Sequence, residues 1–327
     1  MKKVFVLAIL CFAFLLAACT PGAGSLTDPS TYYVYDNGEK YAVGSFVQST
    51  EEIDSINIDW IAGSVTLCGD ENATGVSVRD DYAPKQGYEP YCVHTYVEKG
   101  TLYVKFMRFN LKISTSIPTK KLTVVVPKEY SYKKIALSTV TASTVVTDLT
   151  CLDFTQNSGG IGAGVRTENC FYKAFFTDIT AGDTVIKNCA FSEKTEFSMG
   201  TGSVIMEDSQ TALLSGQCRT GDLVLKNCNV KKADVNISLN GDGYMTDLLT
   251  EDFDLSCAAG NIFVHLSDQM TDYKLDCRSP FSIVYPKDIP KDGARLIRLH
   301  SAAGHVKFLP KEGILALLEP EPKQNKD

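Results

Sequence analysis

Short apolar runs separated by turn-forming residues recur along most of the chain. Runs of Val, Ile, Leu and Phe alternate with Gly, Ser, Thr, Asp and Asn, whereas the apolar spacing of long amphipathic helices is missing. Residues 53–67 and 122–127 are clear examples, and the second run ends at a proline. The pattern therefore predicts an all-β protein.

These strands belong to a repeat. Residues 181–189, 201–209 and 220–228 align without gaps, and turn glycines follow one another at intervals of 20, 19, 20 and 19 residues: Gly182, Gly202, Gly221, Gly241 and Gly260. Like residues at such a spacing indicate a parallel β-solenoid, because its coils stack about 4.8 Å apart and place equivalent side chains over one another. We expect residues 46–308 to form a parallel β-helix with coils of about 19–20 residues, with a first copy at Gly63 and a last at Gly304.

Three columns of the repeat are apolar. The positions four after the glycine hold Ile186, Met206, Leu225, Met245 and Val264, and those three before it hold Ile179, Met199, Cys218, Ser238 and Cys257. We expect the column four after the glycine to face the core. Side chains alternate along a strand, so the column three after the glycine should face outward: Val185, Ile205, Val224, Tyr244 and Phe263. Such a stripe either binds a partner or lies under a second sheet or loop, and the sequence favours neither.

A polar column and a column of small residues stand side by side in the repeat. The polar column reads Thr150, Asn169, Asn188, Asp208, Asn227, Asp247 and Leu266, and its neighbour reads Cys151, Cys170, Cys189, Ser209, Cys228, Leu248 and Ser267. Asn and Asp suit left-handed turns, and a free Cys packs as a small apolar group. We therefore interpret the four cysteines of the second column as a ladder of buried thiols. A disulfide between Cys170 and Cys189 stays open, because one coil spacing lies within the range that a disulfide spans.

The N-terminus has the pattern of a lipoprotein signal peptide over residues 1–18. Two lysines precede an apolar run at residues 4–18, which is shorter than the about 20 residues of a membrane span. The run ends in a sequence that resembles the lipobox of bacterial lipoproteins, Leu16-Ala17-Ala18-Cys19. That resemblance implies cleavage between Ala18 and Cys19 and a palmitate-type lipid anchor on Cys19. The alternative is a plain signal peptide with an incidental cysteine.

Charge and composition limit the partners. Cleavage would remove Lys2 and Lys3, which leaves 30 of the 32 basic residues against 39 acidic ones and moves the formal charge from −7 to −9. Nucleic acids require clustered Lys and Arg, so we expect no nucleic acid partner. We expect residues 19–45 to hold the lipidated cysteine, a spacer and leading strands, and residues 309–327 to be a disordered tail.

Catalytic and metal-binding patterns do not emerge from the sequence. The four histidines show no zinc or triad spacing, so we expect no catalytic residues, no metal and no cofactor. Asp80 and Asp81 are a carboxylate pair of the kind that glycosidases use across a cleft. As neighbours on a chain they would point apart, and we expect them in a solvated loop.

Three features together carry a family resemblance: Ile-Asp-Trp-Ile-Ala-Gly-Ser-Val at residues 58–65, Leu-Thr-Val-Val-Val-Pro at residues 122–127, and the recurring Thr-Gly-Asp/Ser turns. Over roughly residues 50–308 the chain resembles the bacterial putative-adhesin family. The resemblance implies a surface or envelope β-solenoid, with no catalytic residues to transfer.

We therefore expect a non-enzymatic envelope lipoprotein, anchored on the extracytoplasmic side of a membrane. Its solenoid would be an adhesin-like binding or scaffold surface for a glycan or a surface protein. Two alternatives remain. One is a polysaccharide-acting β-helix enzyme, and the other is a self-assembling envelope or stress component that associates through its coil ends.

Overall fold

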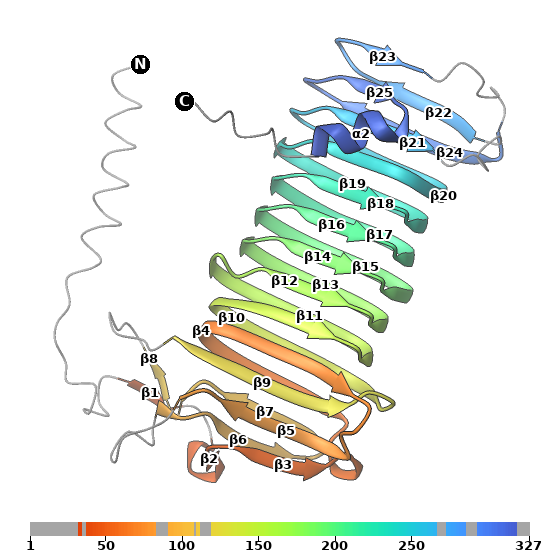
Figure 1. Cartoon of the computed structure of the whole chain (residues 1–327). Helices are drawn as coiled ribbons and strands as arrows, with labels where there is room; N and C mark the ends of the chain where they lie inside the picture. The colour runs from red at the N-terminus through yellow and green to blue at the C-terminus, as the bar shows by residue number, and fades with distance from the viewer. Residues whose placement is uncertain are drawn as a thin grey trace, which may run out of the picture.

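Stacked coils form one elongated solenoid (Figure 1) in the computed structural model, which describes residues 32–34, 37–82, 91–107, 109–111, 119–266, 273–285 and 293–318. Each central coil has a long and a short strand. The long strands are β11 (Thr150–Ile161), β13 (Phe171–Ala181), β15 (Ala190–Thr201), β17 (Gln210–Thr220) and β19 (Asn229–Asn240). The short strands are β12 (Val165–Glu168), β14 (Thr184–Lys187), β16 (Val204–Glu207) and β18 (Leu223–Lys226). The predicted all-β parallel solenoid is confirmed.

Coils pair in parallel and in register with their neighbours. Val185 of β14 aligns with Ile205 of β16, which aligns with Val224 of β18. Three strands bend at a corner and contribute to both faces: β4 (Ser55–Asp70), β10 (Ser131–Thr147) and β20 (Gly243–Cys257). Each coil therefore places its corners directly over those of the next coil.

At the N-terminal end, spatial order departs from chain order. β4 lies between β10 on one side and β7 (Thr101–Lys105) with β9 (Lys120–Pro127) on the other, although β7 and β9 follow it in the chain. Antiparallel strands then cap this end: β5 (Gly75–Asp80) and β3 (Phe46–Ser49) next to β9, and β6 (His94–Glu98) and β2 (Ala42–Val43) next to β7. Smaller elements are β1 (Tyr32–Val34), paired with β8 (Phe109–Leu111), and the short helices η2 (Gly38–Lys40) and η3 (Thr50–Glu52).

The C-terminal end shows the same departure. β24 (Arg295–Ser301) pairs with β20, and β25 (Val306–Phe308) pairs with β21 (Ile262–Leu266). The earlier segments β22 (Tyr273–Arg278) and β23 (Ile283–Val284) lie outside them and form the terminal coil. At both ends, one coil is thus inserted between coils that are closer to each other in sequence.

The repeat glycines form a corner where backbones meet. A Cβ on Gly202, Gly221 or Gly241 would lie 2.0–2.1 Å from the carbonyl oxygen of the preceding glycine in the stack. Their φ angles are +131°, +139° and +156°, a region that L side chains rarely adopt. Gly304 stacks on Gly260 in the same way, since its Cβ would lie 1.9 Å from the Gly260 oxygen. Glycine is therefore required at this corner in the coils of Gly202, Gly221 and Gly241, whereas the earlier coils hold Ala142 and Ala163 there.

Most of the predicted inward columns lie in the core. The column four after the glycine, Ile186, Met206, Leu225, Met245 and Val264, is at most 1% exposed. We predicted Ser238 as a member of the column three before the glycine, and that assignment is wrong. Cys218 aligns instead with Ile237, and Ser238 is exposed. A register shift between Cys218 and Thr220 accommodates the one extra residue of the following coil.

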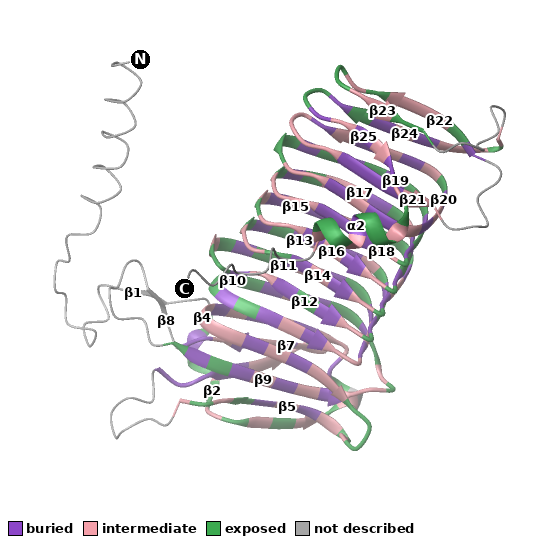
Figure 2. Cartoon of the chain, turned by 45° about the horizontal axis from the view of Figure 1, so that its top comes forward, coloured by how far each residue is buried: buried purple, intermediate pink, exposed green. Residues whose placement is uncertain are grey.

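Helix α2 (Lys311–Leu318) replaces the beginning of the tail that was predicted to be disordered from residue 309. It packs on β20 and β21 (Figure 2), and its Ile314 is fully buried. β20 and β21 carry Tyr244 and Phe263, the last members of the predicted outer stripe, and Phe263 is only 8% exposed. At this end Phe263 is therefore buried by the chain itself, whereas Tyr244 is half-buried, as are Val185 and Ile205.

A buried ion pair anchors the N-terminal cap. Lys120 is fully buried, and its Nζ lies 3.0 Å from Asp80 Oδ2 and donates to the carbonyl oxygens of Tyr91 and Phe106. The Nζ also lies 4.7 Å from the centre of the Trp60 ring, so the ammonium has three acceptors and an aromatic face. Burial lowers the pKa of Lys120, and the Asp80 carboxylate opposes that shift.

The expectation of a solvated loop at Asp80 and Asp81 is therefore wrong for Asp80. Its side chain is only 7% exposed and also accepts the backbone N–H of Val93 at 3.0 Å. Asp81 is exposed and accepts the backbone N–H of Lys121 at 2.7 Å. The two carboxylates have separate structural roles, so they do not form a catalytic pair.

Gly221→Ala should lower the free energy of unfolding by more than about 2 kcal/mol, because the new Cβ meets a backbone oxygen and the φ angle is strained. Denaturant titration followed by circular dichroism would measure this. The control is Gly159→Ala, whose Cβ would meet nothing within 4 Å, and we expect it to change the unfolding free energy by less than about 1 kcal/mol. Equal losses in both variants would contradict the stacked corner.

Lys120→Met should cost about 3–5 kcal/mol, because it leaves the Asp80 carboxylate buried without its cation. The control is Lys105→Met, which removes the partly exposed pair with Asp59, whose side chains are 16% and 39% exposed. We expect that change to cost at most about 1 kcal/mol. Thermal or chemical unfolding of the three proteins compares them, and a Lys120→Met protein as stable as Lys105→Met would rule out the anchoring role.

Candidate binding groove

One corner of each coil is built on a residue in the left-handed conformation. The φ angle lies between 48° and 55° in six stacked positions: Asp148, Asn169, Asn188, Asp208, Asn227 and Asp247. Asn and Asp tolerate this conformation better than other non-glycine residues. The sequence placed five of these residues correctly, but it put Thr150 where the structure has Asp148, and Leu266 aligns with Leu248 rather than with Asp247.

The neighbouring column of small residues differs from the prediction at its start. Thr150 aligns with Phe171, so Leu149 occupies the place that was assigned to Cys151, and Cys151 aligns with Tyr172 in the core. Cys170, Cys189, Ser209 and Cys228 do stack in one column, followed by Leu248. Ser267 lies outside the described residues. A two-residue offset at the first coil caused the error, because Leu149 and Cys151 are both buried apolar residues.

The small residues of this column close the corner by hydrogen bonding. Each side chain donates to the backbone carbonyl two residues earlier, at 3.2 Å for Cys170, Cys189 and Cys228 and at 2.6 Å for Ser209. The left-handed residue between donor and acceptor brings the two groups together. In four successive coils the column therefore holds Cys or Ser, a small side chain that carries a donor, and Leu149 and Leu248 occupy the positions on either side.

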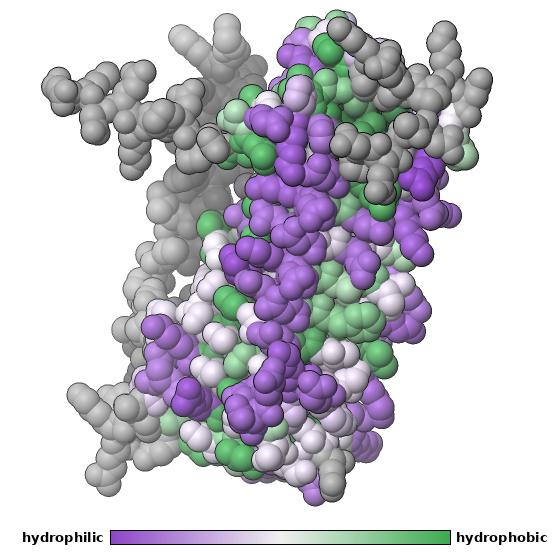
Figure 3. Space-filling view, turned by 45° about the vertical axis from the view of Figure 1, so that its right-hand side comes forward, coloured by the Kyte–Doolittle hydropathy of each residue, from purple (hydrophilic) through white to green (hydrophobic). Residues whose placement is uncertain are grey.

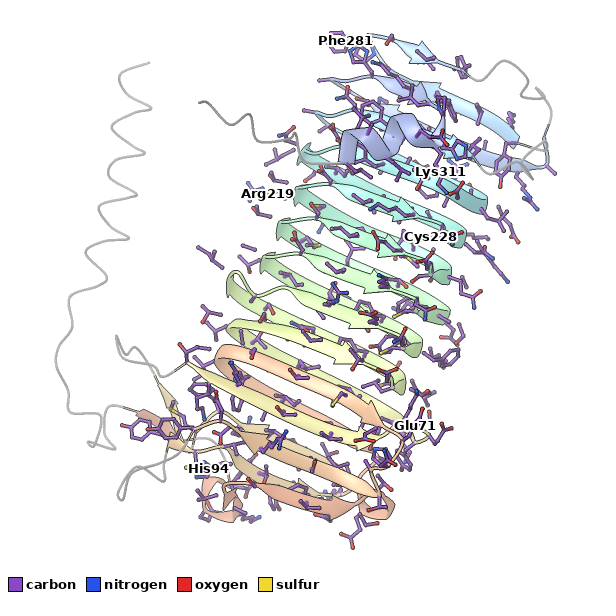
Figure 4. The ribbon with its side chains drawn as sticks, viewed as in Figure 1. Glu71, His94, Arg219, Cys228, Phe281 and Lys311 are labelled. Atoms are coloured by element: carbon purple, nitrogen blue, oxygen red, sulfur yellow. The ribbon has the colours of Figure 1, made fainter. Side chains whose placement is uncertain are left out.

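A groove of about 940 Å³ follows this corner along the solenoid. Its sides include the left-handed residues and Phe171, Gln210 and Asn229, and Cys170, Cys189 and Cys228 also line it. Figure 3, with the right-hand side of Figure 1 turned forward, shows a hydrophilic band along the length of the molecule. In Figure 4, Cys228 lies at this edge of the coils, and Glu71 lies at the same edge toward the N-terminal end.

Ion pairs bind the acidic residues at the two ends of the groove. Near the first coil, Lys128 Nζ lies 3.8 Å from Asp148 Oδ1 and 2.9 Å from Glu71 Oε1. At the far end, Asp247 pairs with Lys311 of α2 and lies 3.3 Å from His265. Between these ends, Asp208 has no ion pair within the part of the chain that the structure describes.

The groove side chains form two hydrogen-bonded runs. Asn169 donates to Asp148 at 3.4 Å, and Asn188 donates to Asn169 at 2.7 Å. In the second run, Asn227 donates to Asp208 at 2.8 Å. Among the described residues no hydrogen bond joins Asp208 to Asn188, whose amide donates to Asn169 instead, and an ionised Asp208 has no proton to donate to the Asn188 oxygen. The middle of the groove therefore exposes acceptor oxygens from neighbouring coils.

Nine cysteines lie in the described residues, and each is a free thiol. Burial raises the pKa of Cys151 and of Cys228 to about 12. Cys170 and Cys189 are aligned across one coil spacing, and among the described residues they are the one pair of cysteines in adjacent positions of this column. The neighbouring side chains of Cys189, Thr167 and Tyr172 lower the pKa of Cys170, whereas the neighbouring Cys170 and burial raise that of Cys189.

Other predicted features fall outside this groove. Ala18 and Cys19 lie outside the described residues, so the lipid anchor stays a prediction. Within the described ranges, no helix is long and apolar enough to cross a membrane, and no group of three or more His, Cys, Asp or Glu side chains is placed to hold a metal ion.

Sequence reasoning missed Phe171 and Lys128 as groove residues. Phe171 is 43% exposed and stands beside the corner, next to Asn169 and Cys170. The periodicity gave no reason to single it out, because its column holds Ala190, Gln210 and Asn229 in the following coils. Lys128 precedes the recognisable repeats and enters the groove only through the stacking of β9 on β4.

Comparison with known proteins gives one family match and several structural likenesses. Residues 93–308 match the family described as Toastrack DUF4097. No curated protein matches the chain.

Among solved structures, a putative lipid binding protein from Parabacteroides distasonis is 15% identical, with a TM-score of 0.41 over 83% of this chain and 97% of its own. A putative adhesin from Bacteroides fragilis is 14% identical, with a TM-score of 0.40 over 82% of this chain and 97% of its own. A putative adhesin from Parabacteroides merdae is 14% identical, with a TM-score of 0.39 over 85% of this chain and 100% of its own.

Proposed function

The chain belongs to the Toastrack DUF4097 family, and from that premise we propose that it is a non-enzymatic, lipid-anchored envelope protein that binds an extended glycan in its corner groove. The observation that carries the glycan assignment is the set of exposed acceptor oxygens at the middle of the groove. The lipobox-like sequence at Cys19 carries the anchor.

The shape of the groove suits a linear polymer. Stacked coils repeat the same corner about every 4.8 Å, so a ligand that lies along the solenoid meets equivalent amide and carboxylate groups again and again. The groove spans six consecutive corners from Asp148 to Asp247, and pairs with Lys128 and Lys311 occupy the acidic groups at its ends. A polymer of repeating units would use this periodicity, whereas a compact small molecule would contact only one or two coils.

The chemistry of the groove favours hydroxyl donors. Asn188 Oδ1 and the Asp208 carboxylate stand in adjacent coils without a donor between them, and both are exposed. A hydroxyl group can donate to such oxygens and accept from the neighbouring Asn amides. Phe171, 43% exposed, adds an apolar surface beside these polar groups, a combination typical of ligand sites.

The same residues argue against catalysis in the groove. Apart from Glu129 at one end, its carboxylates stand in one column along the groove, and a glycosidase needs two carboxyl groups on opposite sides of the scissile bond. Asp247 is further held by Lys311 and His265. This arrangement supports binding without turnover.

Glycan binding is tested with the full chain, purified in detergent, on an array of polysaccharides and matrix proteins. We expect binding to a glycan that weakens about tenfold or more when Asn188→Gly and Asp208→Gly are combined, because at least one hydrogen bond of about 1–1.5 kcal/mol is lost. Glycine keeps the left-handed backbone of both positions. The matched control is Asn37→Gly, at an exposed left-handed residue outside the groove with φ 59° and no side-chain cap bond.

Three results would overturn the glycan proposal. The first is hydrolysis of a bound polysaccharide, seen as new reducing ends. The second is binding to a matrix protein alone, and the third is glycan binding that the paired groove variants leave unchanged.

Lipid anchoring is tested separately in cells. Cys19→Ala should abolish labelling by a palmitate analogue and shift the protein out of the membrane fraction, because the acyl chains supply the apolar contact with the bilayer. Cys11→Ala, in the apolar run before the cleavage point, is the matched control and should keep both. A Cys19→Ala protein that stays membrane-bound, unprocessed and equal in mass to the unchanged protein would disprove the anchor.

A further inference from the structure

Two thiols of the corner column differ from the rest by their position. Cys170 and Cys189 occupy equivalent places in adjacent coils, whereas Ser209 separates Cys189 from Cys228. Each of the two is 3–4% exposed, and both line the groove. They are therefore a dithiol just beneath a surface that solutes reach.

The geometry of the coil suits a bond between them. In-register parallel strands place the two Cα atoms about 4.8 Å apart, within the range of about 4.4–6.8 Å that disulfides span. Both side chains turn toward the same corner, since each sulfur lies 3.2 Å from the carbonyl oxygen two residues before it. Closing the bond needs only a small approach of two side chains that point the same way.

The surroundings of Cys170 favour its thiolate. Cys189, Thr167 and Tyr172 lie next to Cys170 and lower its pKa by more than burial raises it. Thr167 Oγ1 lies 2.7 Å from the Tyr172 hydroxyl and 3.8 Å from Cys189 Sγ, which ties the three groups into one cluster. Cys228 has no neighbouring thiol in its column, because Ser209 and Leu248 occupy the adjacent positions, and burial raises its pKa.

We propose that Cys170 and Cys189 form a thiol–disulfide exchange site, in which Cys170 attacks a small disulfide from the groove and Cys189 resolves the product. The Cys170 thiolate forms a bond to one sulfur of the reagent, whose S–S bond breaks and releases a thiolate that takes up a proton. Cys189 then loses its proton and attacks Cys170 Sγ, which releases the second thiol. Two protein thiols become one disulfide, and one reagent disulfide becomes two thiols. This site is independent of the ligand that the groove binds.

The probe is 2-hydroxyethyl disulfide, which is small and uncharged, added to the reduced full chain at neutral pH. Remaining thiols are alkylated after denaturation, and tryptic peptides are identified by mass spectrometry. Lys173 and Lys187 lie between the two cysteines, so residues 167–173 and 188–194 are separate peptides unless a disulfide joins them. We expect the joined pair to form at least about ten times faster than any adduct at Cys228.

Serine variants separate the two roles without disturbing the corner, because Ser209 shows that serine makes the same hydrogen bond to the backbone. Cys189→Ser should halt the reaction at a mixed disulfide on Cys170, whereas Cys170→Ser should leave Cys189 unmodified. Cys228→Ser should leave the joined peptides unchanged. The proposal is overturned if the folded protein yields no joined peptide while the denatured chain reacts, or if Cys228 reacts as fast as Cys170.

Discussion

Hydrogen bonding between parallel coils fixes neighbouring backbones about 4.8 Å apart, and the rest of the structure depends on that spacing. Every side chain lies over its counterpart in the next coil, so each position must accept a similar residue stacked directly above and below it. At the glycine corner the constraint is strictest, because a Cβ on Gly221 would lie 2.0 Å from a backbone oxygen. From Gly182 to Gly260 this corner lacks side chains, so the backbones of neighbouring coils can meet there.

The opposite corner meets the same constraint with side chains. A left-handed Asn or Asp turns the chain, and a Cys or Ser donates back to the carbonyl before the turn, as Cys228 does to Lys226 at 3.2 Å. This solution leaves the Asn and Asp side chains on the surface and the sulfur atoms beneath them. The groove and the thiol column are therefore two consequences of one turn, repeated in each coil.

Stacking also explains why a serine in place of a cysteine at one position changes the chemistry of the column. Where Ser209 interrupts the cysteines, neighbouring thiols are two coils apart and buried separately. Where Cys170 meets Cys189 with no serine between them, two polarisable donors share one site with Thr167 and Tyr172. Identical residues in one column thus differ in reactivity according to what the adjacent coils contain.

The sequence by itself determined the class of fold, the coil length and the glycine and Asn/Asp corners. In a solenoid, residues at equivalent places in successive coils recur at a fixed spacing along the chain. It also located Ile186 and its column in the core. Its errors at Cys151 and Ser238 arose where a coil differs in length, since the local residues fit either register.

Only the tertiary structure decided which coils touch. β4 and β24 each lie between coils that are nearer to each other in sequence, and any coil of this period can stack on any other. The same holds for Lys120 and Asp80, whose pairing depends on the antiparallel cap, and for α2, which covers one end of an apolar stripe. Packing between segments far apart in the sequence decides which of them are neighbours, and a repeating sequence pattern does not indicate that order.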